Sequence, residues 1–180
     1  MLILASKSPR RKEFLEKANL EFIIDTVETE EIFNPDLSIE DALIDIARQK
    51  VLPVFSKHPN DTILGADTIV VCDNQILGKP KDLNHAREML KLLSGKVHFV
   101  MTAVVIKTKE KETSFVEKTN VYFKKLTEED IDILITKENV LDKAGSYAIQ
   151  GVAGSYIEKI EGDYDNVVGL PIKRVLKYIK

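Results

Sequence analysis

Apolar and polar positions along the first half of the chain follow two different periods. Short apolar runs over 2–5, 20–24 and 62–71 predict buried strands. Between these runs, apolar residues recur at helical spacing after Ser8 and over 38–51. Both helical segments start at a serine, which is a favoured N-cap, and the first continues with a proline, which is tolerated at the first helical position. The first half therefore alternates strand and helix.

The second half of the chain adds hairpins to this pattern. Asp73-Asn74 predicts a tight turn, after which 75–77 returns as a partner strand. The segments 97–107 and 114–124 predict two long antiparallel strands, joined by a charged turn. The remaining predicted elements are helices over 82–93, from Thr127 to about Ile135 and from Pro171, and short strands over 147–149 and 155–160.

This order of elements predicts a single α/β domain over residues 1–180, built on a mixed sheet flanked by helices. No repeat, low-complexity stretch or linker divides the chain, and 180 residues are enough to bury a substantial core. Hydrophobic residues make up 44% of the chain and charged residues 31%, which excludes the composition of a disordered protein.

Charge and cysteine content narrow the possible partners and location. The net charge of −3 argues against a general nucleic-acid coat, which needs a basic surplus, so we expect no nucleic-acid partner. Cys72 is the only cysteine, and no internal disulfide can form. No apolar run reaches about 18 residues, and Lys7 interrupts the first one, so neither a membrane span nor a signal peptide is predicted. These features predict a cytoplasmic protein.

Arg10 and Arg11 fall in the first turn of a predicted helix, where a cation is unfavourable. The free N–H groups and the helix dipole make that end positive, which costs a nearby cation about 0.3–1 kcal/mol. The same end binds anions, and the hydroxyls of Ser6 and Ser8 add donors there. Two interpretations stay open from the residues alone: a phosphate site, or a solvated basic turn.

Asp67 interrupts an otherwise apolar strand. A carboxylate in such a strand is costly unless it is paired, hydrogen-bonded or bound to metal. The functional interpretation is a metal ligand or a base for water at the sheet's edge, while the alternative is that Asp67 ends a strand and caps a turn. Gly65 would let a ligand or a neighbouring backbone come close.

Further charged residues are ambiguous by themselves. Glu30 and Glu31 lie in an acidic segment that is either solvated or supplies a second carboxylate near Asp67, completing an oxygen site for Mg²⁺ or Mn²⁺. Lys50 ends the predicted helix over 38–51, where a cation simply complements the dipole.

Two polar residues of the second half are also candidates. Lys79 is held between Gly78 and Pro80 on a shaped loop and is able to contact a phosphate as a point charge, although the segment is not a P-loop. Gln150 presents a donor and an acceptor together, as reading a base edge requires, or else satisfies backbone groups in a turn.

Several of these residues lie in motifs that resemble the Maf-type nucleotide pyrophosphatases. The N-terminal segment Leu4-Ala5-Ser6-Lys7-Ser8-Pro9-Arg10-Arg11 is similar to the signature of that family. The resemblance spans nearly the whole chain. The other similar motifs are Gly65-Ala66-Asp67-Thr68, Gly78-Lys79-Pro80, Leu93-Ser94-Gly95, Asp142-Lys143-Ala144-Gly145, Tyr147 to Gly151, and Glu161-Gly162 to Pro171.

The resemblance implies a fold, a reaction and a set of residue roles. The fold would be a twisted mixed sheet with two lobes around a deep cleft, similar to inosine-triphosphate pyrophosphatases. The reaction would be hydrolysis of a nucleoside triphosphate between the α- and β-phosphates, with Mg²⁺ or Mn²⁺ as cofactor. Asp67 would accept the proton. The residues implied to hold phosphates are Arg10, Arg11, Lys50 and Lys79, with Glu31 or Glu30 helping at the metal, a position that the segment Glu28-Thr29-Glu30-Glu31 leaves ambiguous by one residue.

The family divides by substrate, and two segments resemble the branch that hydrolyses dTTP, UTP and modified pyrimidine triphosphates. These are the segment from Tyr147 to Gly151 and the segment from Glu161 to Tyr164. Arg10, Thr68 and Gln150 match the specificity positions of that branch. The alternatives are a 7-methyl-GTP pyrophosphatase of the same family, or a nucleotide-binding regulator that does not hydrolyse. The resemblance also implies a role in cleaning the nucleotide pool, linked to division arrest, and a homodimer.

Overall fold

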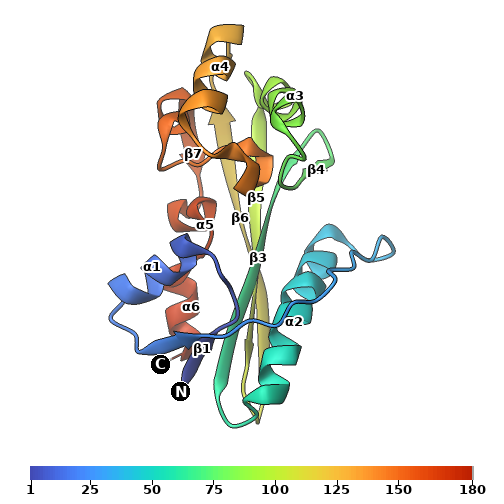
Figure 1. Ribbon diagram of the computed structural model, residues 1–180, viewed down its shortest axis with the longest axis vertical. Coiled ribbons are helices and arrows are strands. Elements are labelled where there is room, and N and C mark those ends of the chain that lie inside the picture. Colours follow the sequence, from blue (N-terminus) through green and yellow to red (C-terminus); the bar gives the residue numbers. More distant parts are fainter. Residues whose placement is uncertain (180) are drawn as a thin grey trace. The chain divides into compact units, whose positions relative to one another are not determined.

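The computed structural model describes residues 1–179, and within them seven strands form one sheet in the order β2-β1-β3-β5-β6-β7, with β4 paired to β3 (Figure 1). The strands are β1 (Leu2–Leu4), β2 (Phe22–Ile24), β3 (Thr62–Cys72), β4 (Gln75–Leu77), β5 (Val97–Lys107), β6 (Glu112–Phe123) and β7 (Ile157–Glu161). The helices are α1 (Pro9–Lys17), α2 (Ile39–Lys57), α3 (Leu83–Leu93), α4 (Glu128–Lys137), α5 (Tyr164–Val168) and α6 (Ile172–Ile179).

The sheet is mixed, as predicted. β1 pairs in parallel with both β2 and β3, and the long connections that parallel pairing needs contain α1 and α2. β3 pairs with β4, and β6 with β7, in antiparallel fashion. Asp73 and Asn74 have positive φ angles of 50° and 61°, the geometry of a tight hairpin turn, which confirms the turn predicted there. The α/β class is therefore confirmed.

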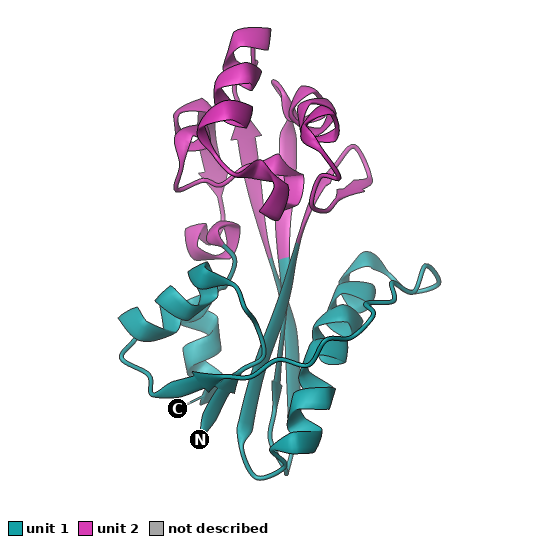
Figure 2. Ribbon diagram, viewed as in Figure 1, with its two compact units in different colours: residues 1–68, 102–117, 169–180 teal, residues 69–101, 118–168 magenta. Residues whose placement is uncertain are grey.

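The chain forms two compact units, each with its own core (Figure 2). The first comprises residues 1–68, 102–117 and 169–180, and the second comprises residues 69–101 and 118–168. Three strands, β3, β5 and β6, contribute residues to both units.

The first unit has helices on both faces of its strands. Alternate residues of a strand point to opposite faces, and Ala66 of β3 lies in a core cluster with Leu15 of α1 and Val175 of α6. Gly65 faces α2 instead, because a β-carbon there would lie 2.3 Å from Cγ2 of Val51. Helices α1 and α6 therefore cover one face and α2 covers the other (Figure 1). The close approach predicted for Gly65 is confirmed, with helix α2 as the neighbour.

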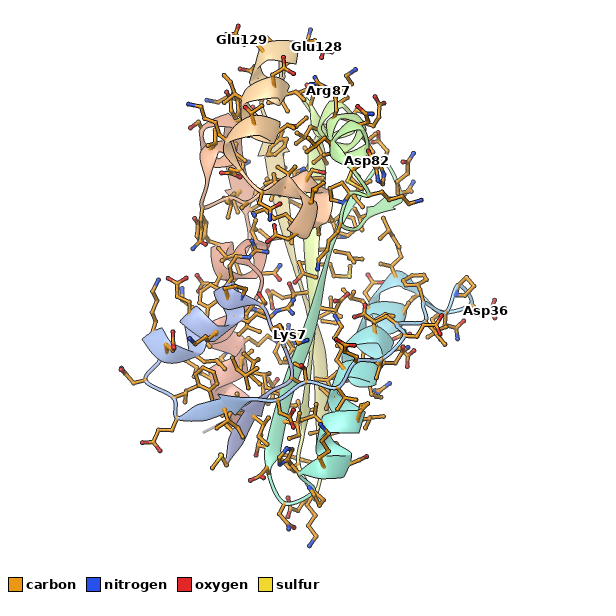
Figure 3. All side chains as sticks on the ribbon, viewed as in Figure 1. Lys7, Asp36, Asp82, Arg87, Glu128 and Glu129 are labelled. Atoms are coloured by element: carbon orange, nitrogen blue, oxygen red, sulfur yellow. The ribbon has the colours of Figure 1, made fainter. Side chains whose placement is uncertain are left out.

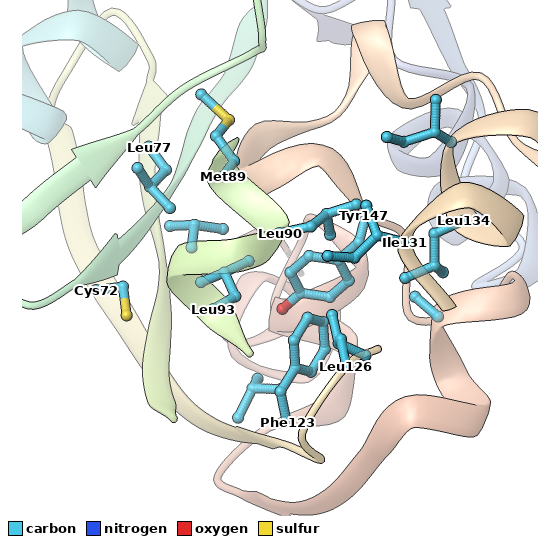
Figure 4. Close-up of a cluster of buried hydrophobic side chains, with 14 of the residues drawn as sticks. Cys72, Leu77, Met89, Leu90, Leu93, Phe123, Leu126, Ile131, Leu134 and Tyr147 are labelled. Carbon is cyan, nitrogen blue, oxygen red and sulfur yellow. The ribbon is translucent and has the colours of Figure 1, made fainter. Parts of the chain in front are cut away.

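The second unit packs α3 and α4 on its strand residues. Leu90 and Leu93 of α3, Leu134 of α4 and Phe123 of β6 share one buried cluster (Figure 4). On the outside of this cluster, Arg87 of α3 forms an ion pair with Glu128 of α4 at 3.1 Å, and Figure 3 labels both residues. Exposed ion pairs of this kind contribute little, so the buried cluster supplies most of the packing free energy.

The structure corrects four predictions about local structure and adds one helix, α5. Residues 147–149 form no strand, because they lie between short 3₁₀ helices over 144–146 and 152–156. The strand predicted over 20–24 is shorter, and α5 was not predicted. Helix α2 continues to Lys57 instead of stopping at 51, because Pro53 is accommodated inside it. β3 runs unbroken through Asp67 with β1 and β5 as neighbours, so it is not an edge strand and does not end there.

No helix within residues 1–179 combines the length and the apolar character needed to cross a membrane.

Candidate active site

Helix α1 begins where predicted, and its first turn is left uncapped by side chains. Ser8 is the N-cap by position, but its hydroxyl makes no capping hydrogen bond, and its N–H donates to Oγ of Ser6 at 3.2 Å. Pro9 occupies the first helical position and has no N–H. The first turn contains no acidic residue, only Arg10 and Arg11. This helix therefore presents a positive end with no acidic side chain in its own first turn to neutralise it.

Arg11 is buried, and its guanidinium is held by four acceptors from separate parts of the first unit. Nε donates to the carbonyl oxygen of Gly169 at 2.9 Å, and Nη2 donates to Oγ1 of Thr68 at 3.0 Å. Nη1 donates both to Oγ of Ser6 at 3.2 Å and to the carbonyl oxygen of Ala66 at 2.9 Å. A guanidinium has five N–H donors, so one on Nη2 is left for a ligand.

The electrostatic surroundings of Arg11 include both kinds of charge. Burial lowers the pKa of its guanidinium, the carboxylate of Asp67 opposes this, Arg10 lowers it further and Glu31 opposes. An arginine stays charged despite such shifts, because its guanidinium does not lose its proton in proteins. The buried cation is therefore balanced by hydrogen bonds and by carboxylates, instead of being neutralised.

Arg10 differs from Arg11 in having no partner. Its side chain makes no hydrogen bond or ion pair with any residue in 1–179, and its Nε is buried without an acceptor. A buried, unpaired donor on a cation is costly unless a ligand satisfies it. Of the two arginines singled out in the sequence, Arg10 is the one whose charge is available to an anion.

Asp67 and Thr68 are adjacent in β3 and therefore point to opposite faces of the strand. Thr68 lies on the α1 face, where its Oγ1 accepts from Arg11 and shares a 2.8 Å hydrogen bond with Oγ1 of Thr102. Asp67 lies on the α2 face, where its Oδ1 forms an ion pair with Nζ of Lys50. One strand thus brings an anchored hydroxyl and a half-buried carboxylate together in consecutive residues.

Lys50 joins the two carboxylates of the site. Besides Asp67, its Nζ contacts Oε1 of Glu31 at 3.2 Å. The side chains of Lys50 and Asp67 are only 22% and 21% exposed, so their interaction is less screened than a surface pair. The explanation that Lys50 simply complements a helix end is wrong, because α2 continues to Lys57 and Lys50 lies well inside it.

Of the two glutamates considered as metal ligands, one contacts Lys50. Glu31 reaches it, whereas Glu30 is exposed and makes no interaction within the described residues. Residues 1–179 contain no group of three or more His, Cys, Asp or Glu side chains that could hold a metal ion. The carboxylates that contact Lys50 are those of Asp67 and Glu31.

Lys79 and Gln150 belong to the second unit, whereas the two arginines of α1, Lys50 and Asp67 belong to the first. Lys79 is exposed on a loop fixed by a hydrogen bond from the N–H of Gly145 to the carbonyl oxygen of Gly78, at 3.1 Å. Gln150 is exposed, and its amide bonds to nothing in residues 1–179. The turn-satisfying role considered for Gln150 is therefore not the one that this structure shows.

The residue types of two members of this arrangement do not by themselves reveal their roles. Thr102 lies in an apolar strand where a threonine is ordinary, and its hydrogen bond with Thr68 links it to the group around Arg11. Gly169 matters through its carbonyl oxygen, which no residue type reveals. Its positive φ of 137° favours glycine, which explains the residue type at this position but not the role of its carbonyl oxygen.

Comparison with known proteins identifies the group to which the chain belongs. The profile of the family described as Maf-like protein matches residues 1–180. The chain belongs to the Maf-like family.

Individual Maf-like relatives are similar along their whole length. A protein of Bacillus cytotoxicus named dTTP/UTP pyrophosphatase is 51% identical over 178 residues, which cover 99% of this chain and 93% of that protein. Proteins of the same name from Bacillus mycoides and from Bacillus cereus strain G9842 are 50% and 49% identical over 179 residues, each covering 99% of this chain and 94% of the relative.

Proposed function

We propose that this Maf-like chain hydrolyses dTTP and UTP, and modified pyrimidine triphosphates, to the monophosphate and pyrophosphate. The observation that carries the proposal is the carboxylate of Asp67, half-buried in β3 and paired with Lys50, in a chain about half identical to proteins named for this reaction. A carboxylate beside a phosphate-binding cation is what hydrolysis of a phosphoanhydride requires.

Asp67 acts as the base in this proposal. The oxygen of a water molecule attacks the α-phosphorus, and the bond from that phosphorus to the oxygen bridging to the β-phosphorus breaks. The water proton passes to the Asp67 carboxylate and later to solvent, and pyrophosphate leaves with the bridging oxygen. Phosphoryl transfer needs mainly positioning and charge stabilisation, and an anchored carboxylate supplies the first.

The cations divide the work between holding phosphate and holding the site. Arg10, whose side chain has no partner among the described residues, binds phosphate oxygens together with the open end of α1. Arg11 contributes its one remaining N–H and otherwise fixes Ser6, Ala66 and Thr68. Lys50 exchanges its carboxylate partners for phosphate oxygens, and Lys79 contacts phosphate as a point charge.

The donor set near Lys50 fits a divalent cation. Mg²⁺ is commonly bound through one or two carboxylates plus substrate phosphates, and Asp67 with Glu31 offers that number. When bound, Mg²⁺ or Mn²⁺ would neutralise charge on the phosphate oxygens. Glu31 is the proposed second ligand in preference to Glu30, because only Glu31 contacts Lys50.

Selectivity for the base rests in this proposal on Gln150, whose free amide offers a donor and an acceptor to the edge of uracil or thymine. Ser6, Ser8 and Thr68 complete the substrate contacts. We further propose that the enzyme acts on the cytoplasmic nucleotide pool. A homodimer and a link to division arrest remain predictions.

The test is pyrophosphate release from a panel of nucleoside triphosphates with Mg²⁺ or Mn²⁺, comparing wild type with Asp67→Asn. We expect turnover of dTTP and UTP in wild type, and a fall in kcat of about 10²–10⁴-fold in the variant, the range for loss of a general base. Unchanged activity in Asp67→Asn would refute Asp67 as the base. Preferred turnover of 7-methyl-GTP, or nucleotide binding without turnover, would refute the proposed substrate or the proposed reaction.

A further inference from the structure

A carboxylate contacts the backbone of the loop that carries Gln150. The side chain of Glu138, the residue after α4, lies against Gly151 and Val152, and its Oε1 accepts a hydrogen bond from the N–H of Val152. The other oxygen, Oε2, is buried and has no hydrogen-bond partner within residues 1–179. A carboxylate with one buried, unpaired oxygen costs free energy, so stability alone does not explain it.

Gly151 makes room for this carboxylate. A β-carbon at residue 151 would lie 1.6 Å from Oε1 of Glu138 and 2.5 Å from its Cδ, so any larger residue would displace the acid. The backbone of Gly151 has a φ of −101°, which other residues also adopt. The glycine is therefore required by the position of Glu138 and not by backbone strain.

The residues just before Gln150 are fixed in the interior of the second unit. Tyr147 is buried, and its ring lies tilted against that of Phe123 with centroids 4.9 Å apart (Figure 4). Its hydroxyl shares a hydrogen bond with Nε2 of His98 at 2.6 Å. Ile149 is also buried. With its neighbours turned inward, Gln150 is left as the exposed, unpaired side chain of the loop.

We propose that Glu138 is a positioning residue for base selectivity, fixing the peptide after Gln150 so that the amide meets the base in one orientation. This inference rests on the proposed pyrimidine triphosphatase function and concerns the selectivity of that reaction, not its chemistry. Glu138 touches neither substrate nor reacting atoms in this proposal. It acts through the Gln150–Gly151–Val152 backbone.

The first experiment measures KM and kcat for dTTP and for dGTP in wild type, Glu138→Ala and Gly151→Ala. We expect KM for dTTP to rise about tenfold in both variants, the loss of about one hydrogen bond between the Gln150 amide and the base, while kcat stays within about twofold. The constants for dGTP should change little. KM for dTTP in the Glu138→Ala/Gly151→Ala double variant should be no higher than in either single variant, because both substitutions remove the same carboxylate from its contact with the loop.

The second experiment asks whether Glu138 acts through Gln150. In a Gln150→Ala background, Glu138→Ala should have no further effect on the ratio of kcat/KM for dTTP to that for dGTP. Glu138→Gln keeps an acceptor oxygen of the same shape and should restore the ratio to within about threefold of wild type. Glu158→Ala, which removes an exposed carboxylate of β7 from the same unit, is the matched control and should behave as wild type.

The outcomes separate this inference from the proposed function. If wild type does not turn over dTTP or UTP, the proposed function fails whatever Glu138 does. If wild type does so, and Glu138→Ala matches Glu158→Ala in KM and in selectivity, the positioning role is refuted while the function stands. Equal losses for dTTP and dGTP, or a lower kcat with unchanged KM, would also overturn it, since a general structural defect affects both substrates alike. Melting temperatures of the Glu138→Gln and Gly151→Ala variants identify any loss of folding.

Discussion

The guanidinium of Arg11 takes the place of a missing strand partner for Ala66. β1 ends at Leu4, and the N–H of the next residue, Ala5, donates a hydrogen bond to the carbonyl oxygen of Leu64 in β3. The carbonyl of Ala66, two residues on, points to the same side, and Nη1 of Arg11 donates to it at 2.9 Å. Because Ala66 directly precedes Asp67, this contact fixes the backbone from which the proposed base projects.

Replacing Arg11 with lysine should lower stability and activity together. Lysine has three donors on one nitrogen and cannot reach acceptors on three separate segments, so the carbonyl oxygens of Ala66 and Gly169 would lose their partner. We expect the free energy of unfolding to fall by about 3 kcal/mol, the cost of leaving buried acceptors unpaired. Urea denaturation followed by circular dichroism measures it.

Arg10→Ala is the companion variant. Since Arg10 has no partner in residues 1–179, its removal should raise KM for the triphosphate by about tenfold or more without lowering stability. If Arg10→Ala destabilises the protein as much as Arg11→Lys does, the division of roles between the two arginines is wrong.

The different roles of Arg10 and Arg11 show which features of the fold and the site can be predicted from the sequence and which cannot. The pattern of apolar positions locates β3, α1 and most other elements, because burial of one face imposes a period on the residues themselves. An unfavourable pair of cations and a carboxylate in an apolar strand also stand out. The roles of Arg10 and Arg11 cannot be separated in this way, because they depend on backbone acceptors such as Gly169, far away in the chain.

The roles of Lys50 and Glu138 could not be predicted from the sequence for the same reason, because they depend on the surrounding fold. A lysine predicted at a helix end has a sufficient local explanation, which disappears only when α2 is seen to run on past Pro53. Glu138 lies in a polar segment, and its burial depends on the loop that folds over it from residues 150–152. Long-range contacts of this kind leave no periodic trace in the sequence.

Removing the charge of Lys50 should change metal binding before any nucleotide is present. Its ammonium neutralises Asp67 and Glu31, and a divalent cation at the same carboxylates must compete with it. We expect Lys50→Met to bind Mn²⁺ about tenfold more tightly than wild type in titration calorimetry without nucleotide. Turnover should nevertheless fall, because a phosphate-binding cation is lost.

The control for this titration is Lys50→Met combined with Glu31→Gln, which removes one carboxylate from the pair. Tighter Mn²⁺ binding should disappear in that double variant. Equal Mn²⁺ affinity in wild type and Lys50→Met would show that the carboxylates near Lys50 are not the metal ligands.

Stability should depend on pH through His98. Burial lowers the pKa of this imidazole to about 4, and only 2% of the residue is exposed. The unfolded chain binds a proton near pH 6.5, whereas the folded chain does so only near pH 4, so folding loses stability as pH falls through that window. The loss reaches up to about 3 kcal/mol and levels off below pH 4.

Denaturation between pH 7 and pH 4 checks this, with His98→Gln as the variant that cannot titrate. The difference in stability between wild type and variant should shrink as pH falls. Tyr147→Phe removes the hydrogen bond to His98 but keeps the burial that lowers the pKa, so it should lower stability equally at each pH and retain the wild-type slope. Parallel pH profiles for wild type and His98→Gln would contradict the assignment.

The contact between Gly65 and Val51 sets the distance between β3 and α2, and with it the pairing of Lys50 with Asp67. Lys50 directly precedes Val51, and Asp67 lies two residues after Gly65 on the same face of the strand. A β-carbon at residue 65 would meet Cγ2 of Val51 at 2.3 Å and the carbonyl oxygen of Ala47 at 3.4 Å, so Gly65→Ala must push the helix outward. We expect a loss of stability of about 1–3 kcal/mol, as for other overpacked sites, and a fall in kcat because Lys50 and Asp67 separate.

Val51→Ala removes the clashing methyl groups, so the Gly65→Ala/Val51→Ala double variant should recover kcat relative to Gly65→Ala while keeping the cavity cost of Val51→Ala. Equilibrium denaturation and steady-state kinetics on the four proteins give the coupling, and additive effects on kcat would show that the helix does not set the geometry of the base.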